Sequence, residues 1–304
     1  MPLDPQLAVM IEAINSLGGA KTHESTPEEA RAAYDAYGAM NPRPDDVAVD
    51  DLEAAGHRAR MYRPADADGQ PLLLFFHGGG FVIGSIESHD ATCAILASAS
   101  GCNVLSAEYR LAPEHPYPAA HDDALAIFEW TADRAESLGA DPTRIAVGGD
   151  SAGGLLTASL SVDARDGRAP AMAAQVLIYP WVDEGCDRPS MTENAVGYVL
   201  ERATVDWFIA NYAQDPDAMA PHHRSPIDVD LAGVAPAVVV SAGYCPFRDQ
   251  NFAYVERLEA AGVDVRHLHY PDLIHTFIQV PAISEASRAA LVEVGEVTAK
   301  LLSA

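Results

Sequence analysis

From residue 71 onward, short apolar runs alternate with longer amphipathic segments along the chain. The apolar runs have the length of buried strands and lie at 71–76, 103–109, 144–149, 173–180, 237–243 and 265–271. Helical patterns lie at 119–139, at about 249–262 and at 283–303. Because strands separated by helices pair in parallel, we expect an α/β fold, with a mostly parallel central sheet flanked by helices.

Two segments depart from this alternation. Residues 1–50 are polar and helical in pattern with no strand, and they end in the boundary signal NPRPDD. Residues 186–225 are irregular apart from one amphipathic stretch, ATVDWFIANYA. We expect both segments to form a lid over a core made of 51–185 and 226–304. Three aromatic residues of the second segment either line a pocket beneath the lid or only pack it down: Trp207, Phe208 and Tyr212.

The run at 144–149 leads directly into Gly149-Asp150-Ser151-Ala152-Gly153. This is a G-x-S-x-G pattern between a predicted strand and a predicted helix, the context in which the serine of a nucleophile elbow occurs. Small residues two places to either side allow a sharp turn, and a helix N-terminus favours a developing negative charge. Ser151 is therefore the candidate nucleophile.

A glycine-rich sequence, His77-Gly78-Gly79-Gly80, ends the first strong strand. Acyl transfer creates an oxyanion that needs preorganised N–H donors, and glycine lets the backbone turn its amides inward. We predict that the backbone N–H groups of Gly79, Gly80 and Ala152 form this oxyanion hole. A phosphate cradle would usually carry a lysine, which is absent here. We expect His77 to hold the loop in place.

A serine hydroxyl needs a neighbouring base before it can attack a carbonyl. His275 lies just beyond the last predicted strand, in DLIHTF, and fits the chain order nucleophile, acid, base. His267 and His269 alternate with apolar residues inside that strand, so we interpret them as structural, and His222 and His223 fall in the lid. His275 is the predicted base.

Composition narrows the possible partners. The formal charge is −25, with Lys21 and Lys300 as the only lysines, which argues against binding to nucleic acid or to an anionic membrane surface. No stretch approaches a membrane span. The N-terminal sequence lacks the features of a signal peptide, which favours a cytoplasmic location. The four cysteines, Cys93, Cys102, Cys186 and Cys245, show neither disulfide nor zinc spacing, and we expect no metal in the active site.

These motifs together resemble those of the bacterial hormone-sensitive-lipase family of carboxylesterases. The matching pieces, in family order, are HGGGFVIGS (77–85), YRLAPEHPYPAA (109–120), GGDSAGG (148–154), LIYP (177–180), PFRD (246–249) and DLIH (272–275). The resemblance implies an α/β-hydrolase fold with a helical cap. It also implies hydrolysis of short- to medium-chain esters without a cofactor, by a monomer or a homodimer paired through an edge strand.

The chain departs from the family at two positions. The family typically reads D-P-L-R-D after the equivalent strand, and its first Asp is the triad acid, but this chain has Cys245 there. Thr276 stands where the family usually has Gly after the base. A neutral thiol supplies no charge to orient the imidazole and stabilise its protonated form, so we expect impaired activity.

Three carboxylates are candidates to replace the missing acid: Asp249, Asp183 and Asp272. Each also has an ordinary structural role available, as a partner of a helix dipole, an arginine or a turn. We therefore weigh two hypotheses. The first is a carboxylesterase that uses Ser151 and His275 on a small-molecule ester. The second is a small-molecule receptor on the same scaffold, which the missing carboxylate favours and the retained serine and histidine oppose.

Overall fold

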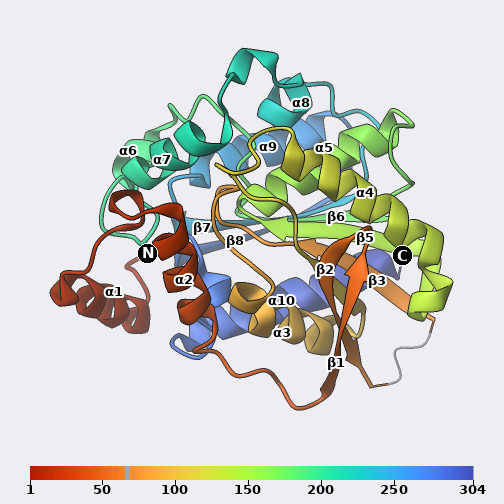
Figure 1. The fold of residues 1–304 in the computed structure, drawn as a ribbon, viewed down its shortest axis with the longest axis horizontal. Helices are drawn as coiled ribbons and strands as arrows, with labels where there is room; N and C mark the ends of the chain where they lie inside the picture. The colour runs from red at the N-terminus through yellow and green to blue at the C-terminus, as the bar shows by residue number, and fades with distance from the viewer. Residues whose placement is uncertain (66–68, 304) are drawn as a thin grey trace.

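The computed structural model describes residues 1–65 and 69–303, and its centre is an eight-stranded sheet (Figure 1). The strands lie in the order β1-β2-β4-β3-β5-β6-β7-β8. Their bounds are β1 Val47–Ala54, β2 His57–Pro64, β3 Gln70–Phe76, β4 Asn103–Ala107, β5 Ala140–Asp150, β6 Ala174–Ile178, β7 Ala237–Tyr244 and β8 Val265–Ile274. The strands from β3 to β8 pair in parallel, as the sequence pattern predicts.

The first two strands form an antiparallel hairpin at one edge of the sheet. Because β1 begins at Val47, the expectation that residues 1–50 contain no strand is wrong for the last four of them. Of the eight residues of β1, only Ala54 is buried, and the other seven are half-buried or exposed. A strand with so little buried apolar surface leaves no apolar run in the sequence, which is why the pattern missed it.

Helices cover both faces of the sheet (Figure 1). On one face lie α3 (Asp90–Ser100) and α10 (Glu285–Leu302), and on the other lie α4 (Ala119–Arg134), α5 (Ala152–Arg165) and α9 (Arg248–Ala260). The strands between them, β3 to β7, are almost wholly buried over the lengths that pair, so that apolar side chains of both sheet faces form the core. None of the helices in the described ranges is both long and apolar enough to span a bilayer.

The remaining helices come from the two segments that break the alternation. They are α1 (Pro5–Leu17) and α2 (Pro27–Gly38) from the first, and α6 (Pro189–Glu193), α7 (Arg202–Tyr212) and α8 (Pro221–Arg224) from the second. The two segments meet: Lys21 pairs with Glu201 at 2.8 Å, and His23 Nδ1 lies 3.1 Å from Thr204 Oγ1. Figure 1 shows α1, α2, α6 and α7 gathered at the same side of the molecule.

The register of the parallel strands decides which loops meet at their carboxyl ends. Phe76 of β3 pairs with Gly149 of β5, so that the glycine-rich loop after β3 begins beside the turn after β5. At the far side, Tyr244 of β7 pairs with Ile274 of β8. Cys245 directly follows Tyr244, and His275 directly follows Ile274, so this pairing brings Cys245 and His275 side by side.

Candidate active site

Ser151 occupies the turn between β5 and α5 with φ 53° and ψ −113°, a backbone conformation that costs a non-glycine residue free energy. The turn is tight because a Cβ at Gly153 would collide with the carbonyl of Phe76, and one at Gly149 would collide with the Gly153 backbone. The Ser151 N–H donates to the carbonyl of Ile178 at 2.9 Å, which holds the turn against the sheet. This geometry presents the hydroxyl above the sheet edge, as expected for a nucleophile elbow.

His275 follows β8 directly, and its Nε2 lies 3.1 Å from Ser151 Oγ. Its ring packs against Tyr179, with centroids 4.4 Å apart, and edge-on to Phe247. Burial lowers the pKa of His275 to about 3, with a smaller opposing effect from the negative charge of Asp150. The imidazole is therefore neutral at pH 7 and able to accept a proton, although burial makes it a weak base.

Cys245 completes the arrangement from β7: its Sγ lies 3.0 Å from His275 Nδ1. The thiol is fully buried, and burial raises its pKa well above the usual value, against smaller lowering effects from the Phe247 amide and from Arg248. The Phe247 N–H donates to Sγ at 3.3 Å. The side chain beside His275 is thus a neutral thiol. The backbone amides and the guanidinium around it would suit an anion at the same position.

None of the three carboxylates considered as replacements hydrogen-bonds to His275 in the described structure, and two of them are occupied elsewhere. Asp249 accepts a hydrogen bond from the Ser190 N–H and pairs with Arg248, and Asp183 pairs with Arg188. For Asp272 the contact is made by the backbone, whose carbonyl oxygen accepts the N–H of Asp4 at 2.9 Å, and its carboxylate is not bonded to His275. Among the residues that the structure describes, His275 hydrogen-bonds only to Ser151 and Cys245. Within the described ranges, no carboxylate takes over the contact that Cys245 makes with His275.

The glycine-rich loop lies directly against Ser151. Gly79 and Gly80 have φ values of 114° and 60°, and a Cβ on Gly80 would strike the Phe208 ring, so the loop conformation requires glycine. Both residues line the same cavity as Ser151. Within the described ranges, the backbone N–H groups of Gly79, Gly80 and Ala152 donate to no protein acceptor. They are therefore available to an oxyanion, the role that the sequence predicts for them.

His77 holds the loop in place. Its Nδ1 lies 2.7 Å from the Gly78 carbonyl oxygen, its own carbonyl accepts from the Tyr109 hydroxyl at 2.7 Å, and the two rings stack. Burial, followed by the neighbouring His89, lowers the pKa of His77 to about 4. A neutral, stacked ring fits the positioning role that we expect from the sequence.

Asp150, the residue before Ser151, has a role that could not be assigned from the sequence. It is 1% exposed, it accepts the Gly78 N–H at 2.7 Å, and it lies 3.1 Å from His89 Nε2. Burial alone would raise its pKa, but the charges and hydrogen bonds of His89, His275 and Gly78 outweigh burial, and the pKa is lowered. Asp150 thus anchors the glycine-rich loop as a carboxylate. Its position inside the GDSAGG motif was the sequence signal for a role of Asp150, but its partners are visible only in the fold.

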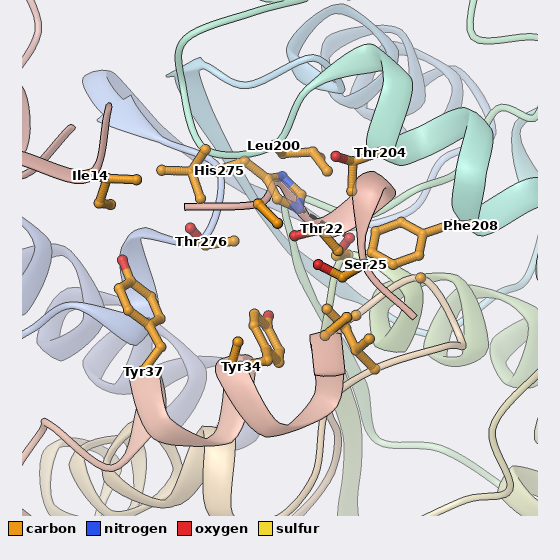
Figure 2. A pocket seen from close by; sticks show the side chains of 18 residues that line it. Ile14, Thr22, Ser25, Tyr34, Tyr37, Leu200, Thr204, Phe208, His275 and Thr276 are labelled. Carbon is orange, nitrogen blue, oxygen red and sulfur yellow. Dashed lines mark hydrogen bonds between the residues drawn. The ribbon is translucent and has the colours of Figure 1, made fainter. Parts of the chain in front are cut away.

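A cavity of about 330 Å³ opens in front of Ser151 and His275 (Figure 2). Figure 2 shows Tyr34 and Tyr37 extending from α2 toward it, and Thr204 and Phe208 reaching it from α7. Of the three aromatic residues expected at a pocket or in packing, Phe208 lines this cavity, whereas Tyr212 stacks on Phe81 outside it. The described lining is mostly apolar and contains no carboxylate, which suits a small uncharged substrate.

The other histidines singled out in the sequence lie apart from this cavity. His267 and His269 both hydrogen-bond to Ser241 Oγ, at 2.8 and 2.9 Å, as expected of structural residues. His222 and His223 belong to α8 and contact Asp163 of α5. None of the four is among the described residues that line the cavity.

Comparison with known proteins agrees with this geometry. Residues 73–279 match the Abhydrolase_3 family, described as an alpha/beta hydrolase fold. An ethyl acetate hydrolase of Pseudomonas putida is 37% identical over 316 residues, covering 97% of this chain and 98% of the relative. The carboxylesterase NlhH of Mycobacterium tuberculosis is 40% identical over 232 residues, covering 74% of this chain and 73% of the relative.

Solved structures lead to the same group of proteins. A hyperthermophilic esterase from the archaeon Pyrobaculum calidifontis superposes with a TM-score of 0.91 at 36% identity, covering 100% of both chains. A thermostable esterase from Pseudomonas putida superposes with a TM-score of 0.92 at 30% identity, covering 99% of this chain and 98% of the other. The similarity therefore extends over residues 1–50 and 186–225 as well as over the rest of the chain.

Proposed function

Because this chain belongs to the Abhydrolase_3 family of α/β hydrolases and is an ester hydrolase, we propose that Ser151 is its nucleophile and His275 its base. The observation that carries the proposal is the 3.1 Å contact between Ser151 Oγ and His275 Nε2, made on a strained turn beside unpaired amides. Backbone strain such as that at Ser151 is typical of active sites, and it is not expected in a chain that catalyses no reaction.

In the acylation half-reaction, Ser151 Oγ attacks the ester carbonyl carbon while His275 Nε2 accepts the hydroxyl proton. The carbonyl oxygen becomes an oxyanion and accepts hydrogen bonds from the amides of Gly79, Gly80 and Ala152. The tetrahedral intermediate then collapses: the bond from carbon to the alkoxy oxygen breaks, and the imidazolium returns its proton to the departing alcohol. The acyl group stays on Ser151.

Deacylation repeats the same steps with water. His275 accepts a proton from the water molecule as its oxygen attacks the acyl carbon, and the same amides bind the second oxyanion. The intermediate breaks its bond to Ser151 Oγ, which regains the proton from His275. The products are one carboxylic acid and one alcohol, and no cofactor takes part.

Cys245 weakens this cycle in two ways. A neutral thiol gives the imidazolium no opposite charge, so the proton transfer from Ser151 loses electrostatic support. The proton between Sγ and Nδ1 also has two positions, since a thiol can donate as well as accept. If Sγ donates, His275 carries its own proton on Nε2, where it faces Ser151 and cannot act as a base. A carboxylate only accepts and so enforces the productive tautomer.

The substrate is a small ester with a short to medium acyl chain. A cavity of about 330 Å³ lies at the small end of the range of ligand pockets, and its apolar lining favours a hydrocarbon chain over a charged group. The relative from Pseudomonas putida is named for ethyl acetate, which is a small ester. We propose that residues 1–50 and 186–225 act as a cap that bounds this cavity, through Tyr34, Leu200 and Phe208 among others.

The test is release of p-nitrophenol from acetate, hexanoate and laurate esters, with Ser151→Ala as the control. We expect slow turnover of the acetate and hexanoate, little turnover of the laurate, and loss of all activity in the control. Equal rates for the unaltered chain and Ser151→Ala would refute the proposal. The receptor hypothesis is not favoured, and failure of a fluorophosphonate to label Ser151 would revive it.

Two further expectations belong with this proposal. The chain is expected to be a monomer or a homodimer that pairs through an edge strand of the sheet, and light scattering after size-exclusion chromatography would distinguish these states. A cytoplasmic location also stays a prediction.

A further inference from the structure

Beyond its esterase site, the fold brings together three potential metal ligands that lie far apart in the sequence. Asp163 lies near the end of α5, and His222 and His223 form the middle of α8. One ligand atom from each residue lies within 4.8 Å of the others. Among the described residues, this is the one group of three or more His, Cys, Asp or Glu side chains so arranged.

The distances within this group suit a shared cation. His222 Nε2 lies 3.0 Å from Asp163 Oδ1, and His223 Nε2 lies 3.7 Å from Asp163 Oδ2. Two ligand atoms at about 2.0–2.1 Å from a tetrahedral zinc ion are roughly 3.3 Å apart. The two separations bracket this value but end on different carboxylate oxygens, so the carboxylate must rotate, together with small ring rotations, to place one oxygen and both nitrogens around one ion.

Surrounding contacts hold the ligands in place before any ion arrives. The Tyr117 hydroxyl lies 3.1 Å from His223 Nδ1 and could accept its proton while Nε2 binds a metal, the arrangement common for metal-bound histidines. His121 stacks on the other side of the His223 ring, with centroids 4.0 Å apart. The Ser159 hydroxyl donates to the His222 carbonyl at 2.8 Å and ties α8 to α5.

The carboxylate is oriented by a cation that occupies only one of its oxygens. Arg168 Nε contacts Asp163 Oδ1 at 2.8 Å, whereas in the described ranges Oδ2 has His223 as its nearest charged or titratable partner. Oδ2 is thus the oxygen offered to a metal. The guanidinium lowers the affinity of the site for a cation but does not block it. The side chains of His222 and His223 are 14% and 18% exposed, so water can reach the fourth position.

We propose that Asp163, His222 and His223 form a binding site for a divalent transition-metal cation such as Zn²⁺, completed by water. Two imidazoles and one carboxylate are ligands that this class of metal accepts. Asp163 comes twelve residues after Ser151 along one helix, so the site is roughly 18 Å from the nucleophile. The ion stabilises the end of the second cap segment against α5 and takes no part in ester hydrolysis.

The test uses the full chain without a histidine tag, first stripped with a chelator and then titrated with Zn²⁺ alone. We expect one saturable site by calorimetry and a rise of several degrees in the melting temperature at zinc about a hundredfold above Kd. Co²⁺ in the same site should show the visible absorption of a tetrahedral complex with nitrogen and oxygen ligands.

Two variants separate this site from other histidines. His222→Ala/His223→Ala should lose the zinc-dependent stabilisation and the cobalt absorption, with its esterase activity intact as proof of folding. His267→Gln/His269→Gln removes a second pair of neighbouring histidines and should keep both signals. A single conservative change, His223→Gln, serves if the double variant does not fold. No saturable binding, or an equal zinc response in the α8 variants, would overturn the proposal, whether or not the chain cleaves esters.

Discussion

At the residue scale, the proposed mechanism makes Cys245 the side chain that limits the rate of ester hydrolysis. Burial raises the pKa of the thiol overall, but its surroundings still suit an anion: the Phe247 N–H contacts Sγ, and the Phe247 and Arg248 amides and the Arg248 charge oppose the effect of burial. A carboxylate there would accept from His275 Nδ1, stabilise the imidazolium and exclude the unproductive tautomer. A thiol can accept a hydrogen bond from Nδ1 only weakly. It gives the imidazolium no opposite charge, and it does not exclude the unproductive tautomer.

We predict that Cys245→Asp raises kcat/KM at least tenfold, equivalent to about 1.4 kcal/mol of transition-state stabilisation. Steady-state kinetics with p-nitrophenyl acetate measure the gain. Cys245→Asn is the matched control, since it has a similar size but no charge and should stay well below the Asp variant. If Asn and Asp performed equally, charge at this position would not be the missing factor.

The same variant should change the pH profile. Activity requires neutral His275, whose pKa burial lowers to about 3, so the acidic limb of kcat/KM in the unaltered chain should lie far below pH 6. A carboxylate at position 245 favours the imidazolium and raises that pKa, which moves the limb to higher pH. Profiles of both proteins measure the shift. A limb at the same pH in both would contradict the assignment of His275 as the titrating base.

Thr276 carries backbone strain beside the base. It adopts φ 71° and ψ 11°, a left-handed conformation that costs a residue with a Cβ roughly 1–2 kcal/mol, and its buried Oγ1 has no partner among the described residues. Thr276→Gly should therefore raise the free energy of unfolding by about 1 kcal/mol, after the entropy of the unfolded chain is subtracted. Urea denaturation measures the change. Thr276→Ala, which removes the hydroxyl but keeps the Cβ, should recover less.

At the scale of elements, the β1–β2 hairpin shows where local sequence and local structure disagree. Its turn residues, Ala55 and Gly56, have φ values of 50° and 87°, the signs of a type I′ turn. Such a turn prefers Asn-Gly, because asparagine tolerates positive φ and alanine does not. The turn imposes its conformation on Ala55 because the register of β1 with β2 leaves only two residues between them.

Ala55→Asn should therefore stabilise the protein by about 0.5–1 kcal/mol. The midpoint of urea unfolding reports this gain, and Ala55→Val, which worsens the strain at positive φ, should move the midpoint in the opposite direction. Indistinguishable midpoints for Asn and Val would show that the turn conformation does not limit stability.

At the scale of the whole molecule, net charge opposes the compact state. A formal charge of −25 places many carboxylates within mutual reach, and this repulsion is screened as the Debye length falls from about 30 Å at 0.01 M salt to about 10 Å at 0.1 M. We predict that the melting temperature rises between these two NaCl concentrations. Scanning calorimetry measures the rise. A melting temperature that fell with added salt would mean that surface ion pairs outweigh the general repulsion.

The features predicted correctly from the sequence are those that depend on residues close together along the chain. Apolar runs located the central strands within a few residues, and the context of Ser151 between a strand and a helix indicated the turn that the structure contains. The β1 strand was missed because it is only half buried. The contacts of Asp150 with His89 and Gly78 were not predicted, since they join residues more than sixty positions apart.

The α/β architecture, the esterase family and the unusual residue at position 245 could all be predicted from the sequence, because each depends on hydrophobic periodicity or on a contiguous motif. Two facts emerged only from the folded chain: among the described residues no carboxylate takes the place of Cys245 beside His275, and Asp163 meets His222 and His223. Both outcomes depend on strand register and helix packing, which place side chains within a few ångströms regardless of their separation along the chain.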